Sequence, residues 1–299
     1  MTTMKATPIK DEPTRRWGFT DEELAERPTV YRDDLLADQV YIVSGGGSGL
    51  GRAMTFLLAR LGARVMICGR RGEKLEHCRE AVSALVPGSQ IATTAMTIRD
   101  PEQVEALVER TWSEFGRLDG IVNNGGGQFP QAAIDFSVKG WNAVIDTNLN
   151  GTWYMMQSAA RRWRDEGRPG SIVNIVALVQ RGMPQVAHTC AARAGVVYLS
   201  KTVAVEWAPL DIRVNCVAPG SVETEGFNVY PPAAAEAFRY SNPLQRLGDA
   251  YDIAEAVVYL LAPSGKFVTG EVLTVDGGGQ QWGDVWPAGI PDYFRIPER

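Results

Sequence analysis

The sequence predicts one α/β domain, a Rossmann-like, doubly wound parallel sheet with helices on both faces. Two observations predict it. Short apolar runs rich in β-branched residues alternate along the chain with longer segments whose apolar residues have helical spacing, an order typical of parallel sheets. A glycine-rich turn at residues 44–51 joins the first such run to the first helical segment, as in dinucleotide-binding folds. With 299 residues and 45% hydrophobic content, the chain can bury one large core and requires no second domain.

The glycine-rich turn lies inside a predicted strand–turn–helix–strand unit. Residues 40–43 form an apolar run, residues 52–61 have helical spacing, and residues 64–68 form the second strand. Glycines let the backbone approach a ligand closely, and the free amides at a helix start favour a pyrophosphate. We therefore expect a dinucleotide there, rather than a glycine-rich loop without a ligand. The residues expected to contact it are Ser44, Gly45, Gly47, Ser48, Gly49 and Leu50.

The end of the second strand indicates which dinucleotide is bound. A site for NAD(H) usually places a carboxylate there to hold the ribose 2′-hydroxyl. Here Cys68 and Gly69 are followed by Arg70 and Arg71, and no acidic residue comes before Glu73. Guanidinium groups match the oxygens of a 2′-phosphate, so we expect NADP(H) rather than NAD(H). The alternative is that the two arginines are a solvated surface pair.

The remaining elements continue the alternation of strands and helices. Helices are predicted at residues 73–85, 101–115, 141–162 and 193–207, and strands at residues 90–97, 118–122, 171–176 and 213–220, the last with its exit turn. Glycine-rich or polar turns follow the strands, and parallel sheets bind ligands at the carboxyl ends of their strands. We expect this domain to span residues 39–279.

Three segments lie outside or on this predicted core. Residues 1–38 form a polar arm in which Thr20 and Glu23 predict a capping box for a short helix, lying over the domain or over a neighbouring subunit. Residues 223–243, with Phe227, Tyr230, Phe238 and Tyr240, fit a lid over an acyl chain or an ordinary connecting helix. The aromatic tail at residues 280–299 is expected to pack on a neighbouring subunit.

Composition restricts the partners and the compartment. The net charge of −5 and the pI of about 5.3 argue against nucleic acid or an anionic membrane as a main partner. No segment has the roughly 20 apolar residues of a membrane span, and the N-terminus has no signal-peptide core. Four cysteines without paired spacing favour a reduced, cytoplasmic protein.

Several short motifs together resemble those of the short-chain dehydrogenase/reductase family. The resemblance covers about residues 38–280. It implies a nicotinamide cofactor, and it implies that the protein is a homo-oligomer, either a tetramer or a dimer. The motifs are residues 44–51, 123–126, Asn148 in its helix, residues 215–220 and residues 275–278. By position, it implies that Asn124 and Gly125 line the adenosine side of the cofactor. It also implies that Val222 and Thr224, which follow Pro219 and Gly220, contact the nicotinamide amide.

The usual catalytic set of that family is not found at the corresponding positions. The resemblance implies a serine after the strand that carries Asn174 and a Tyr-x-x-x-Lys motif at the start of the next helix. Alignment places Ala177, Thr189 and Arg193 there, and no Tyr-x-x-x-Lys occurs in the chain. Reduction of a carbonyl needs a proton on oxygen, and a positioned general acid contributes about 10²–10⁴-fold. A threonine hydroxyl and a permanently charged guanidinium are poor replacements for that acid.

Reduction of a carbon–carbon double bond conjugated to a thioester has a different requirement. Hydride adds to Cβ, and hydrogen-bond donors stabilise the enolate oxygen. Residues 123–129 and 188–195 resemble trans-2-enoyl-CoA reductases of the peroxisomal type and, more distantly, 2,4-dienoyl-CoA reductases. We therefore expect an NADPH-dependent reductase that acts on the 2,3 double bond of an acyl-CoA thioester.

This expectation assigns a role to five residues. Gln128 would donate a hydrogen bond from its amide to the substrate oxygen, or else form a hydrogen bond within its own turn. Thr189 would be a second donor, or else the N-cap of its helix. Arg193 would hold the cofactor ribose, or else form a surface salt bridge. The resemblance implies that Asn148 supports a water chain, and His188 is the titratable group expected nearest the nicotinamide, although a lone histidine is more often structural.

Two other functions fit the sequence. An alcohol or aldehyde dehydrogenase of the acyclic terpene type would need an unconventional acid such as His188. The second is a nucleotide-binding scaffold or sensor that no longer catalyses a reaction. Thr224 at the nicotinamide and the arginine pair at the phosphate argue against it, because a protein without hydride transfer would not need to bind both ends of the cofactor.

Overall fold

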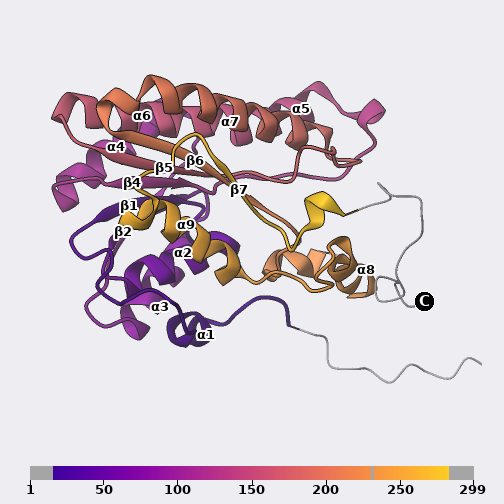
Figure 1. The fold of residues 1–299 in the computed structure, drawn as a ribbon, viewed down its shortest axis with the longest axis horizontal. Coiled ribbons are helices and arrows are strands. Elements are labelled where there is room, and N and C mark those ends of the chain that lie inside the picture. The colour runs from indigo at the N-terminus through magenta and orange to yellow at the C-terminus, as the bar shows by residue number, and fades with distance from the viewer. Residues whose placement is uncertain (1–15, 230–231, 283–299) are drawn as a thin grey trace, which may run out of the picture.

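The computed structural model describes residues 16–229 and 232–282. A seven-stranded sheet, parallel throughout, has the strand order β3-β2-β1-β4-β5-β6-β7. Figure 1 shows α4, α5, α6 and α7 on one face of the sheet and α1, α2, α3 and α9 on the other. The predicted doubly wound α/β fold is therefore confirmed.

The strands are β1 (Val40–Ser44), β2 (Arg64–Gly69), β3 (Gln90–Ala95), β4 (Gly120–Asn123), β5 (Gly170–Ile175), β6 (Ile212–Pro219) and β7 (Val272–Val275). The helices are α1 (Asp21–Glu26), α2 (Gly49–Arg60), α3 (Gly72–Leu85), α4 (Pro101–Phe115), α5 (Val138–Ile145), α6 (Gly151–Glu166), α7 (Ala187–Glu206), α8 (Pro232–Ala237) and α9 (Ala250–Leu261).

Strand β1 is the centre of the core because both of its faces are covered. Its five residues are all buried. Tyr41 and Val43 pack into the cluster on the α2 and α9 side, whereas Val40 and Ile42 pack into the cluster on the α4 and α6 side, as the alternation of side chains along a strand requires. The chain order reverses at β1, whose neighbours are β2 and β4. Such a reversal opens a crevice at the carboxyl ends of the strands.

Two helices differ from their predicted bounds. The helix expected at 141–162 is two helices, α5 and α6, joined by a π-helical turn at Asp146–Asn150 that contains Asn148. The helix expected from 193 begins six residues earlier, at Ala187, with Val186 as its N-cap residue. The alternative that Thr189 is the N-cap is therefore wrong, because Thr189 lies inside the first turn.

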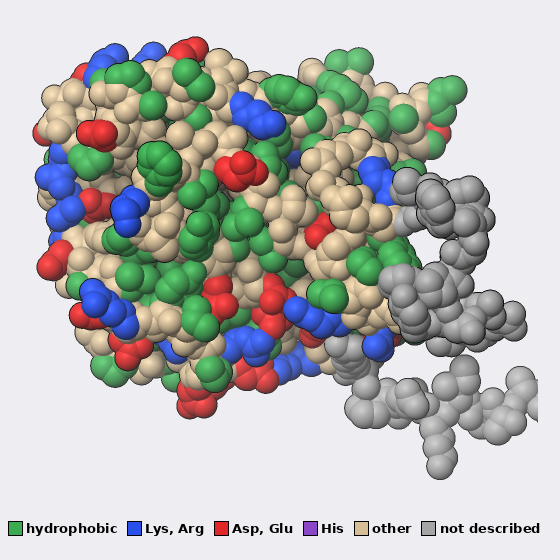
Figure 2. Space-filling model, in the orientation of Figure 1, with side chains coloured by type: hydrophobic (Ala, Val, Ile, Leu, Met, Phe, Trp, Pro, Cys, Tyr) green, Lys and Arg blue, Asp and Glu red, His purple; other side chains and the backbone are tan. Residues whose placement is uncertain are grey.

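The N-terminal arm lies over its own domain from residue 16 onward. Thr20 and Glu23 form the predicted capping box of α1, and the Tyr251 hydroxyl of α9 donates to the Leu24 carbonyl at 2.6 Å. Acidic and basic side chains are interspersed along the lower edge of Figure 2, where α1 and α3 lie in Figure 1. Ion pairs in this region include Arg16–Glu23 and Arg79–Glu76.

The described part of residues 223–243 contains three short helical pieces: Glu225–Val229, α8, and Phe238–Ser241. Tyr230 and the part of the aromatic tail beyond 282 lie outside the described residues, and so do the roles predicted for them. Within the described ranges, no helix is long and apolar enough to cross a membrane.

Candidate active site

The glycine-rich turn is shaped so that side chains would not fit. Gly45 has a φ of 68°, which favours glycine. A Cβ at Gly51 would collide with the Gly45 carbonyl oxygen, so the first turn of α2 packs directly on the end of β1. Gly45 and Gly51 therefore keep the backbone close to the crevice, and the Gly49 amide at the start of α2 donates to the Glu225 carboxylate at 2.8 Å.

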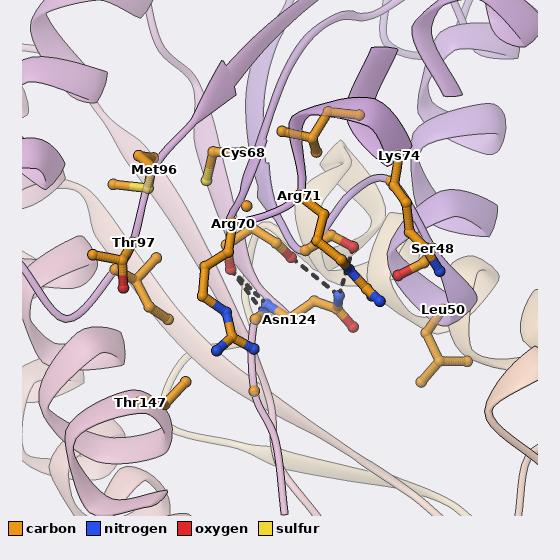
Figure 3. Close-up of a pocket in the computed structure, with 18 of the residues that line it drawn as sticks. Ser48, Leu50, Cys68, Arg70, Arg71, Lys74, Met96, Thr97, Asn124 and Thr147 are labelled. Atoms are coloured by element: carbon orange, nitrogen blue, oxygen red, sulfur yellow. Dashed lines mark hydrogen bonds between the residues drawn. The ribbon is translucent and has the colours of Figure 1, made fainter. Parts of the chain in front are cut away.

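A cavity opens beside this turn, at the ends of β1, β2, β3 and β4 (Figure 3). Five of the six residues predicted in the turn line it, all but Gly49. Four cationic side chains also line it, and no carboxylate does among the residues described there; the four are Arg70, Arg71, Lys74 and Arg99. In Figure 3 the ends of Arg71 and Lys74 lie near Ser48, whereas Arg70 extends past Asn124 toward Thr147. The two arginines are exposed and line the mouth of this cationic pocket, so the structure is compatible with a phosphate-binding role and with the solvated pair that the sequence also allowed.

Ser44 ties the exit of β4 to the glycine-rich turn. Its hydroxyl accepts from the amides of Asn124 at 3.1 Å and Gly125 at 2.8 Å. The Asn124 side chain donates back to the Ser44 carbonyl at 3.0 Å. These bonds use the Ser44 hydroxyl and the Asn124 Nδ2 within the protein, so the two residues shape the cavity wall.

A second cavity adjoins the first at the ends of β4, β5 and β6. Leu50, Asn124 and Gly126 line both cavities and so form the boundary between them. The second cavity brings together four of the five residues predicted to be catalytic, and no tyrosine or lysine lines it among the residues that the structure describes. The predicted residues that line it are Gln128, Asn148, Thr189, Arg193, Pro219 and Gly220, together with Ala177.

The two residues expected at the nicotinamide amide line other surfaces. Val222 lines a smaller neighbouring cavity with Gly220. Thr224 lines the first cavity, with Ser48 and Leu50.

Arg193 is a buried cation rather than a surface residue. It is 8% exposed, and one of its terminal nitrogens, Nη1, has no hydrogen-bond partner among the described residues. Burial lowers the pKa of its guanidinium to about 10, so it stays charged at neutral pH. The bare backbone of Gly126 makes room for it, because a Cβ there would collide with Nη2. A buried donor without a partner is costly, which indicates that an acceptor completes this site.

Asn148 holds the loop that carries Gln128. Its Oδ1 accepts from the Gly127 amide at 3.0 Å, and its Nδ2 donates to the Gly127 carbonyl at 3.0 Å. The π-helical turn presents this side chain to the loop. Gln128 itself is exposed at the cavity, and its side chain makes no hydrogen bond within the described part of the chain.

His188 lies behind Thr189 and outside the cavity lining. It is fully buried, with its ring centroid 4.7 Å from that of Phe129 and 4.5 Å from that of Phe136. Its Nδ1 accepts from the Thr189 amide at 2.7 Å and lies 3.3 Å from the Thr189 hydroxyl. Burial lowers the pKa of His188 below its ordinary value, which favours the neutral imidazole.

Several lining residues had no predicted role. Lys74 lies in the first turn of α3, three residues after the N-cap residue Arg71, so its short distance in sequence from the arginine pair could have marked it. The loop after β5 contributes Gln180, Arg181 and Met183 to the second cavity. These three carry no local pattern that would mark them.

A glycine-rich cradle at a helix start, a cationic pocket beside it and an adjoining cavity with hydrogen-bond donors define a dinucleotide-dependent oxidoreductase. The family model described as "Enoyl-(Acyl carrier protein) reductase" matches residues 45–280. The chain belongs to the short-chain dehydrogenase/reductase family, as the sequence motifs predicted, and the family uses a nicotinamide cofactor.

Relatives and a solved structure agree with this placement. A "Probable 2,4-dienoyl-CoA reductase [(2E)-enoyl-CoA-producing]" of Bacillus subtilis is 37% identical over 251 residues, 82% of this chain and 97% of that protein. A "Peroxisomal 2,4-dienoyl-CoA reductase [(3E)-enoyl-CoA-producing]" of Danio rerio is 37% identical over 265 residues, 87% of each chain. The solved structure of a citronellol catabolism dehydrogenase from Pseudomonas aeruginosa PAO1 superposes with a TM-score of 0.75 at 36% identity, over 85% of this chain and 99% of that one.

Proposed function

We propose that the protein reduces the 2,3 double bond of an enoyl-CoA-type thioester with NADPH. The observation that carries the proposal is the second cavity, where Gln128, Thr189 and the buried cation Arg193 line a space next to the cofactor cradle. The described lining offers donors but no tyrosine or lysine to protonate a carbonyl oxygen. The dienoyl-CoA reductases among the relatives support a thioester substrate.

The first cavity fits the phosphorylated cofactor. The turn at 44–51 would hold the pyrophosphate at the start of α2, where the Gly49 amide binds the Glu225 carboxylate. Arg71 and Lys74, which converge near Ser48 (Figure 3), are suited to the oxygens of a 2′-phosphate. NAD(H) would normally need a carboxylate for its free 2′-hydroxyl, and the described lining has none.

The residues of the second cavity act on the substrate oxygen. The bound nicotinamide supplies the hydride that adds to Cβ. Gln128 Nε2 and the Thr189 hydroxyl donate to the thioester oxygen, where negative charge collects as the enolate forms, and a well-placed donor contributes about 3–4 kcal/mol. Arg193 holds the ribose hydroxyls, and its charge also stabilises the enolate. Cα then takes a proton from water or a weak acid.

The test compares two glutamines of the same loop. We expect Gln128→Ala to lower kcat/KM for NADPH oxidation with a medium-chain trans-2-enoyl-CoA by about 10²-fold. Gln131→Ala is the matched control, because the Gln131 side chain donates to the Asp135 carbonyl and does not line the cavity. Equal rates for the two variants would contradict the role of Gln128.

A dehydrogenase acting on an acyclic terpene alcohol is the second candidate, favoured by the likeness to the citronellol catabolism dehydrogenase. Proton transfer would then run from the substrate hydroxyl through Thr189 to His188, whose Nδ1 lies 3.3 Å from the Thr189 hydroxyl. Citronellol-dependent reduction of NADP⁺ that His188→Gln abolishes would support this function. Nucleotide binding without turnover of either substrate would support the scaffold instead.

We also propose a cytoplasmic homo-oligomer, a tetramer or a dimer. Tyr198 and Val205 on α7 are 71% and 76% exposed, and a second copy of the chain would cover them. Light scattering during size-exclusion chromatography tests the assembly, and a monomer at micromolar concentration would contradict it.

A further inference from the structure

We propose that residues 17–19 of the N-terminal arm position the segment 223–227 against the glycine-rich turn, and so keep Thr224 in the wall of the cofactor cavity. The inference rests on the proposed cofactor site but not on the proposed reaction. Trp17 and Gly18 are then positioning residues for cofactor binding. They precede residues 45–280, the range that the family model matches.

The arm contacts this segment through a ring, a hydrogen bond and its backbone. Trp17 is 7% exposed, with its ring centroid 5.4 Å from that of Phe227. The Gly18 amide donates to the Glu223 carboxylate at 3.2 Å. Gly18 has a φ of 79°, and a Cβ there would lie 3.0 Å from the Glu225 nitrogen and 3.3 Å from the Thr224 Cα. The arm therefore packs closely on the backbone of Thr224 and Glu225, and only glycine fits without strain.

The same segment is bound on its other side to the start of α2. The Glu225 carboxylate accepts from the Gly49 amide at 2.8 Å, at the helix terminus where negative charge is favourable. A Cβ at Gly49 would lie 3.9 Å from the Thr224 Cβ. Thr224 is therefore packed against the turn that shapes the cofactor cavity, and it lines that cavity.

Separate contacts anchor the arm to the helix that begins at the turn. Arg52, in the first turn of α2, donates to the Asp21 carboxylate at 2.8 Å and to the Phe19 carbonyl at 2.5 Å. The Arg52 and Asp21 side chains are each 17% exposed, so this ion pair is shielded more than a surface pair. The arm, the segment 223–227 and the start of α2 thus form a closed ring of contacts.

Loss of the arm contact should loosen the segment without changing the chemical step. We expect Trp17→Ala to raise the Kd for NADPH about fivefold or more and to speed amide hydrogen exchange in residues 223–229. The kcat at saturating NADPH should change less than about twofold, because Trp17 touches neither cavity. The matched control is Glu22→Ala, an exposed residue of the same arm, which should leave both readouts at the wild-type values.

A double-mutant cycle separates positioning from general destabilisation. Trp17→Ala and Phe227→Ala should be non-additive in the Kd for NADPH, because each removes the same ring contact. Additive effects, or unchanged exchange in residues 223–229 of Trp17→Ala, would overturn the inference. Exchange is measured without nucleotide, so it tests the arm even if the wild type fails to bind NADPH. That failure would count against the proposed cofactor instead.

Discussion

Gly126 and Arg193 fit together only because Gly126 has no side chain. A Cβ on Gly126 would collide with Nη2 of Arg193 and lie 3.1 Å from Oδ1 of Asn148. The loop after β4 and helix α7 are thus in direct contact at the point where the two cavities meet. The position of the guanidinium is set by this backbone as much as by its own helix.

The first prediction uses two adjacent glycines of that loop. Gly126→Ala should displace the guanidinium and lower kcat/KM about 10²-fold, since a misplacement of about 1 Å can have that effect. Gly127→Ala is the control, because a Cβ at Gly127 meets nothing within 4 Å, and its kcat/KM should stay within about threefold of the wild type. Similar kinetics for the two variants would show that the Arg193 position is not critical.

The second prediction separates stability from activity at Arg193. A buried cation whose Nη1 lacks a partner within the described ranges destabilises the nucleotide-free fold. Arg193→Met should therefore raise the free energy of unfolding by about 1 kcal/mol or more, while kcat/KM falls about 10²-fold. Urea denaturation without nucleotide and steady-state kinetics are the measurements, with Arg193→Lys as the variant that keeps the charge. A marked loss of stability in Arg193→Met would mean that the guanidinium has a structural partner.

The third prediction concerns pH and His188. Because burial lowers the folded-state pKa of His188 below its ordinary value of 6.5, the unfolded chain binds this proton more tightly than the folded one. Stability should therefore rise with pH through the window between the lowered folded pKa and about 6.5, and fall as the pH drops through it. Denaturation series from pH 5 to pH 8 should show a shallower slope in His188→Gln. An identical slope in both proteins would mean that the pKa of His188 is the same folded and unfolded.

The fourth prediction tests the cationic pocket. Arg71→Ala should raise the Kd for NADPH about tenfold, because a charge-assisted hydrogen bond contributes about 1.5–3 kcal/mol, and should leave the Kd for NADH nearly unchanged. Arg79→Ala is the control, because Arg79 lies on α3, the helix that begins just after Arg71, and pairs with Glu76. Calorimetric titration with both nucleotides provides the constants. A parallel loss for NADH would assign Arg71 to the part of the cofactor that the two nucleotides share.

Most of the fold could be predicted from the sequence, because short stretches of residues determine where its strands, helices and turns form. The strands, the amphipathic helices and the turn at 44–51 could be predicted because each depends only on residues that are neighbours in the sequence. The early start of α7 was missed because Val186 cannot cap a helix through its side chain. The division between α5 and α6 was missed because the backbone keeps helical angles at Ile145 and Asn150, on both sides of the π-helical turn, and no proline marks the junction.

The site was predicted less completely, for a different physical reason. Gln128, Asn148, Thr189 and Arg193 could be assembled because each follows a strand or lies on a helix next to one. The contacts of Gly18 with Glu223 and of Gly49 with Glu225 join residues 205 and 176 positions apart. No periodicity or motif marks such pairs, so only the folded chain reveals them.

The most direct test of the proposed function is a comparison of two substrates in the wild-type protein. NADPH oxidation is followed by absorbance with a medium-chain trans-2-enoyl-CoA and, separately, with the aldehyde of the same chain. We predict turnover of the thioester and a rate at least about 10²-fold lower with the aldehyde, because the donors of the second cavity stabilise an enolate and its described lining has no tyrosine or lysine to protonate a carbonyl oxygen. Turnover of the aldehyde alone would contradict the enolate mechanism and direct attention to Thr189 and His188 as the proton path.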